Sequence, residues 1–291
     1  MKVLVTGGTG FVGRHLIPRL QSEGFDVRSL ARRPGDMPAG VESVAGSITD
    51  RDDVRRAVEG VDAVVHLVAI IVERGTQTFE AVNHGGTRTL IEGMQAEGVR
   101  RLVHQSALGA GPDERYPYLR TKWLGEEAIR ASSLDWTILR PSVVHGPGAG
   151  FFRPIMWSLR WAPVYPMPAG GRTRFQPIAI DDLATCFVRA LRGEQVGATL
   201  DLGGPEIMTF SDIVRTVMEV LGKRRKLVSV PVWAARPFAA VQGLRKEPLV
   251  TNQQLDMVVL DNTCALDSVE RTFGFRPVRM ADTDLRWLAR L

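Results

Sequence analysis

The sequence predicts an α/β fold in which a doubly wound parallel sheet is joined to a smaller C-terminal region. Through the first half of the chain, short apolar runs alternate with amphipathic stretches, and a glycine-rich turn directly follows the first apolar run. After about residue 145 the composition shifts to Pro, Gly and aromatic residues. Such alternation is typical of a parallel sheet that helices cover on both faces.

Each element of this fold follows from its own pattern. Short apolar runs rich in β-branched residues predict strands at residues 2–6, 25–30, 63–69, 101–107 and 135–141. Amphipathic stretches predict helices at 11–23, 50–60, 83–98 and in the segment that carries Tyr118 and Lys122. The helix at 50–60 has acidic residues in its first turn, where the helix dipole favours them.

Composition restricts the compartment in which the protein works. The chain has 291 residues, 44% of them hydrophobic, and its two cysteines, Cys186 and Cys264, lie far apart. This argues against a disulfide framework and favours a reducing compartment. No apolar run is long enough to span a bilayer, and the strand expected from residue 2 leaves no room for a targeting peptide. We therefore expect a cytoplasmic protein, with peripheral association with the inner membrane face as an alternative.

Basic residues exceed acidic ones, and the net charge is +5. Most of the cations are arginines scattered through the chain, but KRRK at 223–226 forms a cluster. A solvated surface is the plainer interpretation, and an acidic partner or an anionic membrane face is the sharper one. We expect no nucleic-acid partner, because no recognition motif accompanies the charge.

A glycine-rich turn, TGGTGFVG, joins the first predicted strand to the first predicted helix. Its glycines have the spacing G-x-x-G-x-x-G: the first permits a tight turn, the second lets the backbone approach a pyrophosphate, and the third lets helix and strand pack closely. The helix N-terminus offers free N–H groups to phosphates. The pattern predicts a Rossmann-type dinucleotide site, and a tight turn without a ligand is the plainer interpretation. The predicted site residues in this segment are Gly7, Thr9, Gly10, Phe11, Val12 and Gly13.

The end of the second predicted strand bears on which dinucleotide binds. An NAD site usually has an acidic residue about 20 residues beyond the glycines, where it binds the ribose 2′-hydroxyl. Arg32 and Arg33 stand there instead. Guanidinium groups suit a 2′-phosphate, because they form charge-assisted and often bidentate bonds. The sequence therefore favours NADP(H), with NAD(H) as the alternative and two solvated arginines as the plainer interpretation.

Two regions are expected along the chain. Residues 1–145 form the predicted dinucleotide-binding Rossmann core. Residues 146–291 form a mixed segment that completes the core at about 175–200 and supplies a smaller region for substrate or partner. No linker or repeat separates the two regions.

Several segments resemble the extended short-chain dehydrogenases/reductases, which are NAD-dependent epimerase/dehydratase-like proteins. They are the glycine turn, VN-x-x-GT at 82–87, Tyr118-x-x-x-Lys122 and LRPSVVHGPG at 139–148. Later segments are similar to an atypical branch that contains the Rossmann-fold accessory subunit of respiratory complex I and its bacterial relatives. These later segments are residues 175–184, 200–214 and 249–262.

The resemblance implies further cofactor contacts on the same edge of the sheet. It assigns to the cofactor site Ser47 and Ile48 by the adenine, Leu67, Val68 and Ala69 along the ribose and phosphates, and Pro141 and Val143 near the nicotinamide. Asn83 matches an asparagine at the start of a helix that supports this side of the sheet. Ser47 departs from the aspartate that is common in the family, which weakens adenine recognition there.

Tyr118 and Lys122 are the predicted catalytic pair. At a spacing of four they share one face of a helix. The resemblance implies that the tyrosine is the general acid/base of hydride transfer, and a neighbouring ammonium group would lower its pKa. Lys122 could also bind the nicotinamide ribose. A hydroxyl that holds the substrate is harder to find: Ser106 is a candidate, with a strand-end hydrogen bond as its plainer role, and Ala107 and Leu108 carry no hydroxyl.

Other side chains add little chemistry but suggest partners. The five histidines show no metal-ligand spacing, and His66 and His104 read as satisfied core residues. Residues 151–166 and 223–244 combine aromatic and basic side chains. This mixture suits a membrane surface, a protein complex or a hydrophobic, quinone-like ligand. A substrate lid with ordinary core residues is the plainer interpretation.

Three hypotheses of function remain open at this point. The first is an NADP(H)-preferring oxidoreductase that uses Tyr118 and Lys122, whose turnover the sequence leaves unproven. The second is a non-catalytic protein that holds NADP(H) as an accessory, assembly or redox-sensing component linked to complex I or quinone metabolism. The third is a sugar-nucleotide-type epimerase or dehydratase.

Overall fold

The computed structural model describes residues 1–33, 35, 37–243, 245 and 248–290. The chain divides into two compact units. The first unit comprises Met1–Pro141 and Ile180–Asp201, and the second comprises Ser142–Ala179 and Leu202–Leu291.

The first unit is built on a seven-stranded sheet in the order β11-β6-β5-β4-β1-β2-β3. Its strands are β1 (Lys2–Thr6), β2 (Asp26–Ala31), β3 (Glu42–Ala45), β4 (Ala63–His66), β5 (Arg101–Gln105), β6 (Asp135–Pro141) and β11 (Ala198–Leu202). Neighbouring strands from β3 across to β6 pair in parallel. The strand order reverses between β1 and β4, which is where ligands bind in sheets of this kind. The predicted fold class is confirmed.

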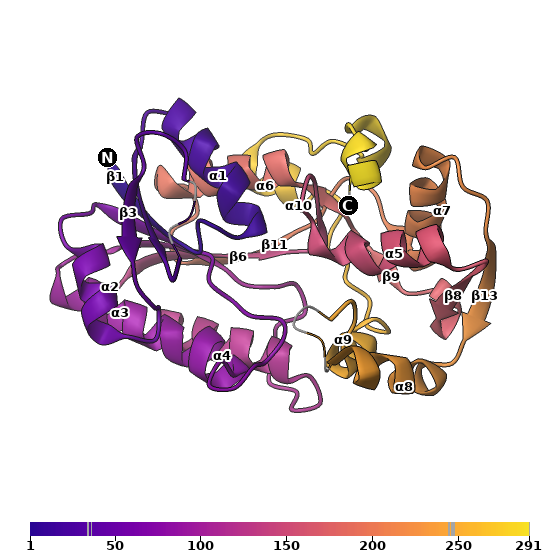
Figure 1. Ribbon diagram of the computed structural model, residues 1–291. Helices are drawn as coiled ribbons and strands as arrows, with labels where there is room; N and C mark the ends of the chain where they lie inside the picture. The colour runs from indigo at the N-terminus through magenta and orange to yellow at the C-terminus, as the bar shows by residue number, and fades with distance from the viewer. Residues whose placement is uncertain (34, 36, 244, 246–247, 291) are drawn as a thin grey trace. The chain divides into compact units, whose positions relative to one another are not determined.

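Helices cover both faces of this sheet, as Figure 1 shows. α1 (Phe11–Ser22) and α6 (Ile180–Leu191) lie on one face. α2 (Arg51–Val58), α3 (Gly86–Ala96) and α4 (Pro117–Arg130) lie on the other. A π-helical turn, η1 (Glu80–Gly85), leads into α3, so the helix expected at 83–98 begins earlier than its pattern indicated.

Apolar side chains of the sheet and of α2 and α3 form the main core of the first unit. Leu4, Val64 and Leu102 come from adjacent strands and are fully buried against Val54 and Leu90 of the helices. Each side chain of this kind that leaves water contributes about 1.5–3 kcal/mol to stability. The central strands are buried on both faces, which explains why they appear in the sequence as continuous apolar runs.

The observed strands differ from the predicted ones mainly at β3, β4 and β5. β4 ends at His66, so Leu67–Ala69 form a partly exposed loop, and β5 ends at Gln105 before Ser106. Single backbone bonds continue the ladder beyond each end, from Leu67 N–H to Thr6 and from Ser106 N–H to Leu139. β3 was not predicted at all. It is an edge strand with mostly exposed residues, so it lacks the apolar pattern that identifies a buried strand.

The second unit consists of short elements around an aromatic core. Three two-stranded sheets pair β7 (Val144–His145) with β10 (Ile178–Ala179), β9 (Arg174–Phe175) with β12 (Met208–Thr209), and β8 (Val164–Pro168) with β13 (Lys226–Val230). The helices are α5 (Arg153–Trp161), α7 (Phe210–Val220), α8 (Val232–Gly243), α9 (Asn252–Met257) and α10 (Ser268–Phe273). The rings of Phe151, Phe175 and Phe210 lie within about 6 Å of one another in this core. Among the described residues, none of the helices has both the length and the apolar character needed to cross a membrane.

Candidate functional site

The glycine turn lies at the carboxyl end of β1, where the strand order reverses. Gly7 has a φ of 79°, a left-handed conformation that favours glycine. Its N–H donates to Leu30 O, and Gly10 N–H donates back to Gly7 O at 2.9 Å, which closes the turn. A Cβ at Gly7 would lie 3.2 Å from the backbone nitrogen of Val68, so the turn packs closely on the loop after β4.

The first turn of α1 is open to an anion. Gly10 is the N-cap residue and provides no side-chain hydrogen bond to the free N–H groups of the helix. The absence of side chains at Gly7 and Gly10 leaves the backbone accessible, and the positive end of the helix dipole lies there. Phe11 and Val12 form the first turn of the helix and remain half-buried, while Thr9 precedes the cap. This arrangement fits a pyrophosphate.

Gly13 is the position at which helix and turn come closest. A Cβ there would lie 2.5 Å from both Gly7 O and Gly8 Cα, which are backbone atoms that cannot turn aside. We expect Gly13→Ala to lower the free energy of unfolding by about 1–3 kcal/mol, because overpacking forces the backbone to shift. The displaced turn should also weaken dinucleotide binding by about tenfold or more, since each 1.4 kcal/mol of lost contact is a factor of ten.

Thermal unfolding and a dinucleotide titration of Gly13→Ala would check this expectation. Gly150→Ala is the matched control, because Gly150 is exposed and has open space around its Cβ position. If Gly13→Ala matches wild type in both measurements, the close approach of the helix to the turn does not constrain binding.

Arg32 and Arg33 follow β2 directly and are exposed. The guanidinium group of Arg32 donates to Gln77 Oε1 at 2.9 Å. This bond uses one of the five N–H groups of Arg32, so donors remain for an anion. The two arginines thus present cations beside the glycine turn, as Leu30 and Gly7 are hydrogen-bonded neighbours.

Ser47 and Ile48 lie in the loop after β3. The Ser47 N–H donates to the Asp53 carboxylate at 2.8 Å, and the Ser47 hydroxyl bonds to Thr49. Ile48 is 6% exposed and packs against Gly86, where a Cβ would lie 2.9 Å from Ile48 Cγ2. The loop is therefore well anchored, and contact of either residue with an adenine stays a prediction.

Asn83 anchors the loop that includes Leu67, Val68 and Ala69. Its side-chain oxygen accepts from Ile70 N–H at 2.9 Å, and its amide nitrogen donates to Ile70 O and to the Thr121 hydroxyl on α4. These bonds engage both ends of a side chain that is 1% exposed. Asn83 thus positions the loop after β4 against α4, as its family position implied, rather than offering free polar atoms to a ligand.

Lys122 is buried at the carboxyl end of β5. Its Nζ donates to Gln105 O at 2.6 Å and lies 3.4 Å from His104 Nε2. Burial lowers the pKa of Lys122 to about 8, although the Glu126 carboxylate opposes the shift. An amine with this pKa holds or releases a proton near neutrality, which is a property of functional lysines.

Tyr118 differs from the expectation in its acidity. The tyrosine is half-buried, with its ring 5.9 Å from that of Phe79 in an edge-on contact. Burial raises the pKa of Tyr118 to about 12. This raised pKa contradicts the prediction of a pKa lowered by the Lys122 ammonium, whose hydrogen bonds go to β5. Tyr118 is therefore a protonated phenol at neutral pH.

A row of polar side chains crosses the sheet beside Lys122. Thr6, His66 and His104 occupy aligned positions on β1, β4 and β5. Burial lowers the pKa of His66 to about 3 and that of His104 well below its usual value, so both rings are neutral. His66 bonds to Thr6 and Thr87, as expected of a satisfied core residue. His104 differs, because its Nδ1 is buried without a hydrogen bond in the described part of the chain.

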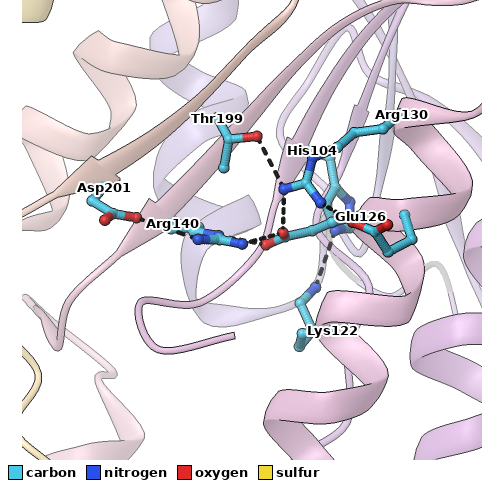
Figure 2. A network of polar contacts seen from close by, with 8 residues as sticks. His104, Lys122, Glu126, Arg130, Arg140, Thr199 and Asp201 are labelled. Carbon is cyan, nitrogen blue, oxygen red and sulfur yellow. Dashed lines mark hydrogen bonds and ion pairs between the residues drawn. The ribbon is translucent and has the colours of Figure 1, made fainter. Parts of the chain in front are cut away.

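An ion-pair network not predicted from the sequence holds α4 one turn beyond Lys122 (Figure 2). Glu126 has a side chain that is 0% exposed and accepts from Arg140 Nε at 2.7 Å and from Arg130 at 2.7 Å. Arg130 also donates to Thr199, and Arg140 lies 3.8 Å from Asp201. The network joins α4 to β6 and β11. The only sequence signal is the i, i+4 ladder of Tyr118, Lys122, Glu126 and Arg130.

The remaining predicted positions are Ser106, Pro141 and Val143. The Ser106 hydroxyl is buried and makes no hydrogen bond within the described residues, and Leu108 N–H donates to Pro141 O. Pro141 ends β6 in the first unit, whereas Val143 belongs to the second unit and accepts from Ile178 N–H.

The described residues include no group of three or more His, Cys, Asp or Glu side chains that could hold a metal ion.

A glycine turn at the switch point of a parallel sheet, leading into an uncapped helix, defines a Rossmann-type dinucleotide-binding domain. The family model described as NAD(P)H-binding matches residues 7–151. A 3 beta-hydroxysteroid dehydrogenase/Delta 5-->4-isomerase of Mycobacterium tuberculosis is 30% identical, over 95% of this chain and 86% of that protein. The chain therefore belongs to the NAD(P)H-binding short-chain dehydrogenases/reductases.

Two other comparisons extend this result. NADH dehydrogenase [ubiquinone] 1 alpha subcomplex subunit 9 of Arabidopsis thaliana is 27% identical, over 81% of this chain but only 62% of the plant protein. The crystal structure of UDP-glucose 4-epimerase from Thermotoga maritima has a TM-score of 0.75 at 20% identity, with 100% of this chain and 98% of that chain covered. At this identity the structural likeness shows the fold alone.

Proposed function

We propose that the protein is an NADP(H)-dependent oxidoreductase that reduces a carbonyl group, with Tyr118 as proton donor and Lys122 beside the nicotinamide ribose. The observation that carries the proposal is Lys122, a buried amine with a pKa of about 8 at the carboxyl end of β5. β5 neighbours β4, and β4 neighbours the strand that leads into the glycine turn. The amine therefore lies on the cofactor edge of the sheet.

The protonated state of Tyr118 suits the role of a proton donor. With a pKa of about 12, the phenol is protonated at neutral pH and can donate a proton to the oxygen of a carbonyl as that carbonyl is reduced. Donation leaves a phenolate in the same buried place, where burial disfavours charge, so the phenol must take up a proton again before the next turnover. The bound nicotinamide would supply the hydride. Lys122 holds α4 to the end of β5, and Asn83 holds the loop after β4 to α4. These bonds would keep both elements in place beside a bound substrate.

Arg32 and Arg33 support a preference for NADPH over NADH. Replacing both with glutamine is expected to weaken NADPH binding by about tenfold or more, because charge-assisted hydrogen bonds are worth about 1.5–3 kcal/mol each. NADH lacks the 2′-phosphate, so its affinity should change little. Titration by fluorescence or calorimetry, with both dinucleotides, measures the change.

Arg100→Gln with Arg192→Gln is the matched control for that titration, since both side chains are exposed and belong to the same unit. An equal loss of NADPH affinity in the control would mean a general effect of charge. Wild-type protein that binds NADH as tightly as NADPH would contradict the preference.

Turnover itself is tested on the purified wild-type protein. Its absorbance near 340 nm reports bound reduced cofactor, and loss of that absorbance with carbonyl and quinone substrates reports reduction. NADPH consumption that depends on substrate supports the oxidoreductase. Tight retention of cofactor without consumption for any of these substrates supports the second candidate.

That second candidate is a non-catalytic protein that holds NADP(H), as an accessory component associated with complex I or quinone metabolism. The buried Ser106 hydroxyl favours it, because Ala107 and Leu108 provide no accessible hydroxyl to hold a substrate oxygen. The likeness to the plant complex I subunit supports the same role. We also propose a cytoplasmic location, in keeping with the thiol form of Cys186 and Cys264.

A further inference from the structure

We infer that one surface of the second unit docks on an anionic lipid bilayer. This surface, the aromatic–basic face, is formed by Arg153, Trp157, Arg160, Trp161, Val164, residues 223–226, Trp233, Phe238 and Val241. It lies within residues 151–166 and 223–244, of which residue 244 is outside the described residues. The residues of this face belong to the second unit, whereas the glycine turn, Tyr118 and Lys122 belong to the first.

α5 contributes tryptophans and arginines on a single side. Its buried residues include Ile155, Met156 and Leu159. The exposed positions are Arg153, Trp157, Arg160 and Trp161, which follow the spacing i, i+4, i+7, i+8 of one helical face. The guanidinium of Arg160 lies 5.7 Å from the centre of the Trp161 ring. An exposed face of Trp and Arg is typical of helices that lie in the membrane interface.

α8 exposes an apolar side as well. Ala239 and Gln242 are buried, whereas Trp233 is 73% and Val241 65% exposed. Arg236 is the one charged residue of this helix, and it pairs with Asp256 of α9. An exposed helix face without unpaired charge is unusual in a protein that meets only water.

Contacts within the second unit make these parts continuous. The rings of Trp157 on α5 and Phe238 on α8 lie 6.0 Å apart. Val164, which follows α5, pairs in register with Lys226, the last residue of the basic cluster (Figure 1). The cluster lines part of a surface hollow of about 530 Å³, together with the end of α7. The lining residues are Arg215, Met218, Glu219, Gly222, Lys223, Arg224 and Arg225.

The positive charge of the aromatic–basic face favours an anionic partner. Residues 142–180 and 223–243 contain no Asp or Glu and nine Arg and Lys residues, of which Arg174 and Arg236 form ion pairs with Asp261 and Asp256. Contact of this face with a second copy of itself would bring like charges together, which is unfavourable. An anionic lipid surface offers opposite charge to the cations and an interface into which Trp side chains partition. Because none of the described helices can cross a membrane, this contact would lie on the bilayer surface.

Vesicle co-sedimentation of the full chain tests the inference. We expect binding to vesicles of phosphatidylcholine with phosphatidylglycerol, and little binding to phosphatidylcholine alone. Trp161→Ser with Trp233→Ser should lower the partition coefficient by about tenfold or more, because two large apolar side chains no longer enter the interface. Changing residues 223–226 to glutamine should lower it by about fivefold for each charge removed, and added salt should weaken binding.

Two control variants separate the loss of this face from a general loss of exposed apolar or charged side chains. Val196→Ser with Leu266→Ser removes two apolar side chains that are about half exposed. Changing Arg51, Arg55, Arg100 and Arg192 to glutamine removes four exposed cations. Both controls should bind vesicles as wild type does. NADPH titration of every variant confirms folding. Equal loss in the controls, equal binding to neutral vesicles, or self-association without vesicle binding would overturn the inference.

Discussion

Glu126→Leu is expected to lower the free energy of unfolding by about 3–5 kcal/mol, the usual cost of removing one partner of a buried ion pair. The side chain is fully buried between Arg130 and Arg140, and its hydrogen bonds raise the pKa of Arg140. Without the carboxylate, the guanidinium groups of Arg130 and Arg140 lose the anion that they share, and little water can take its place. The loss should be cooperative, because the network joins a helix to two strands.

Urea unfolding at neutral pH measures this change. Glu92→Gln is the matched control, since Glu92 forms an ion pair with Arg51 at 3.1 Å in which both side chains are exposed. Exposed pairs of this kind contribute about 0–1 kcal/mol, so the control should stay near wild type. A Glu126→Leu protein as stable as the control would show that the network contributes nothing to folding.

Tyr118→Phe is expected to reduce turnover by about 100-fold or more, the lower end of what a general acid contributes. The change removes the proton donor and leaves the ring in its edge-on contact with Phe79. NADPH affinity should therefore stay within about twofold of wild type, because the lost hydroxyl is expected to act in the transition state and not in cofactor binding. Steady-state rates with the substrate that wild-type protein reduces fastest, together with a titration, separate the two effects.

Tyr116→Phe is the control on the same helix. Tyr116 is half-buried at the N-cap of α4, with Arg115 5.6 Å from the centre of its ring. Loss of a hydroxyl there should leave the rate unchanged. Rates that fall equally in both variants would point to disturbance of α4, and full activity in Tyr118→Phe would exclude the tyrosine as proton donor.

Local patterns in the sequence were sufficient to predict the glycine turn after β1 and the strand that precedes Arg32. Gly7, Gly10 and Gly13 act through backbone geometry, which depends on residues a few positions apart, and Arg32 directly follows a strand with a clear apolar pattern. The same holds for the helix that carries Tyr118 and Lys122. β3 could not be found this way, because an exposed edge strand has no apolar pattern to detect.

Long-range contacts set the chemistry of the predicted pair. Lys122 bonds to Gln105, 17 positions away, and Tyr118 is shielded by Phe79, 39 positions earlier in the chain. Spacing indicates that two side chains share a helix face, but it does not indicate where an ammonium group points. The pKa of the Tyr118 phenol is set by burial, which depends on the packing of α4. The spacing in the sequence therefore did not predict it.

The sequence by itself determined that this protein is an α/β dinucleotide-binding protein, because glycine spacing and strand–helix alternation are local and carry direct geometric consequences. The tertiary structure decided what surrounds the site. It placed Glu126 between two arginines, turned Lys122 toward β5 and brought Trp157 of α5 beside Phe238 of α8. Burial and charge pairing arise between segments far apart in the chain, so only the folded arrangement fixes them.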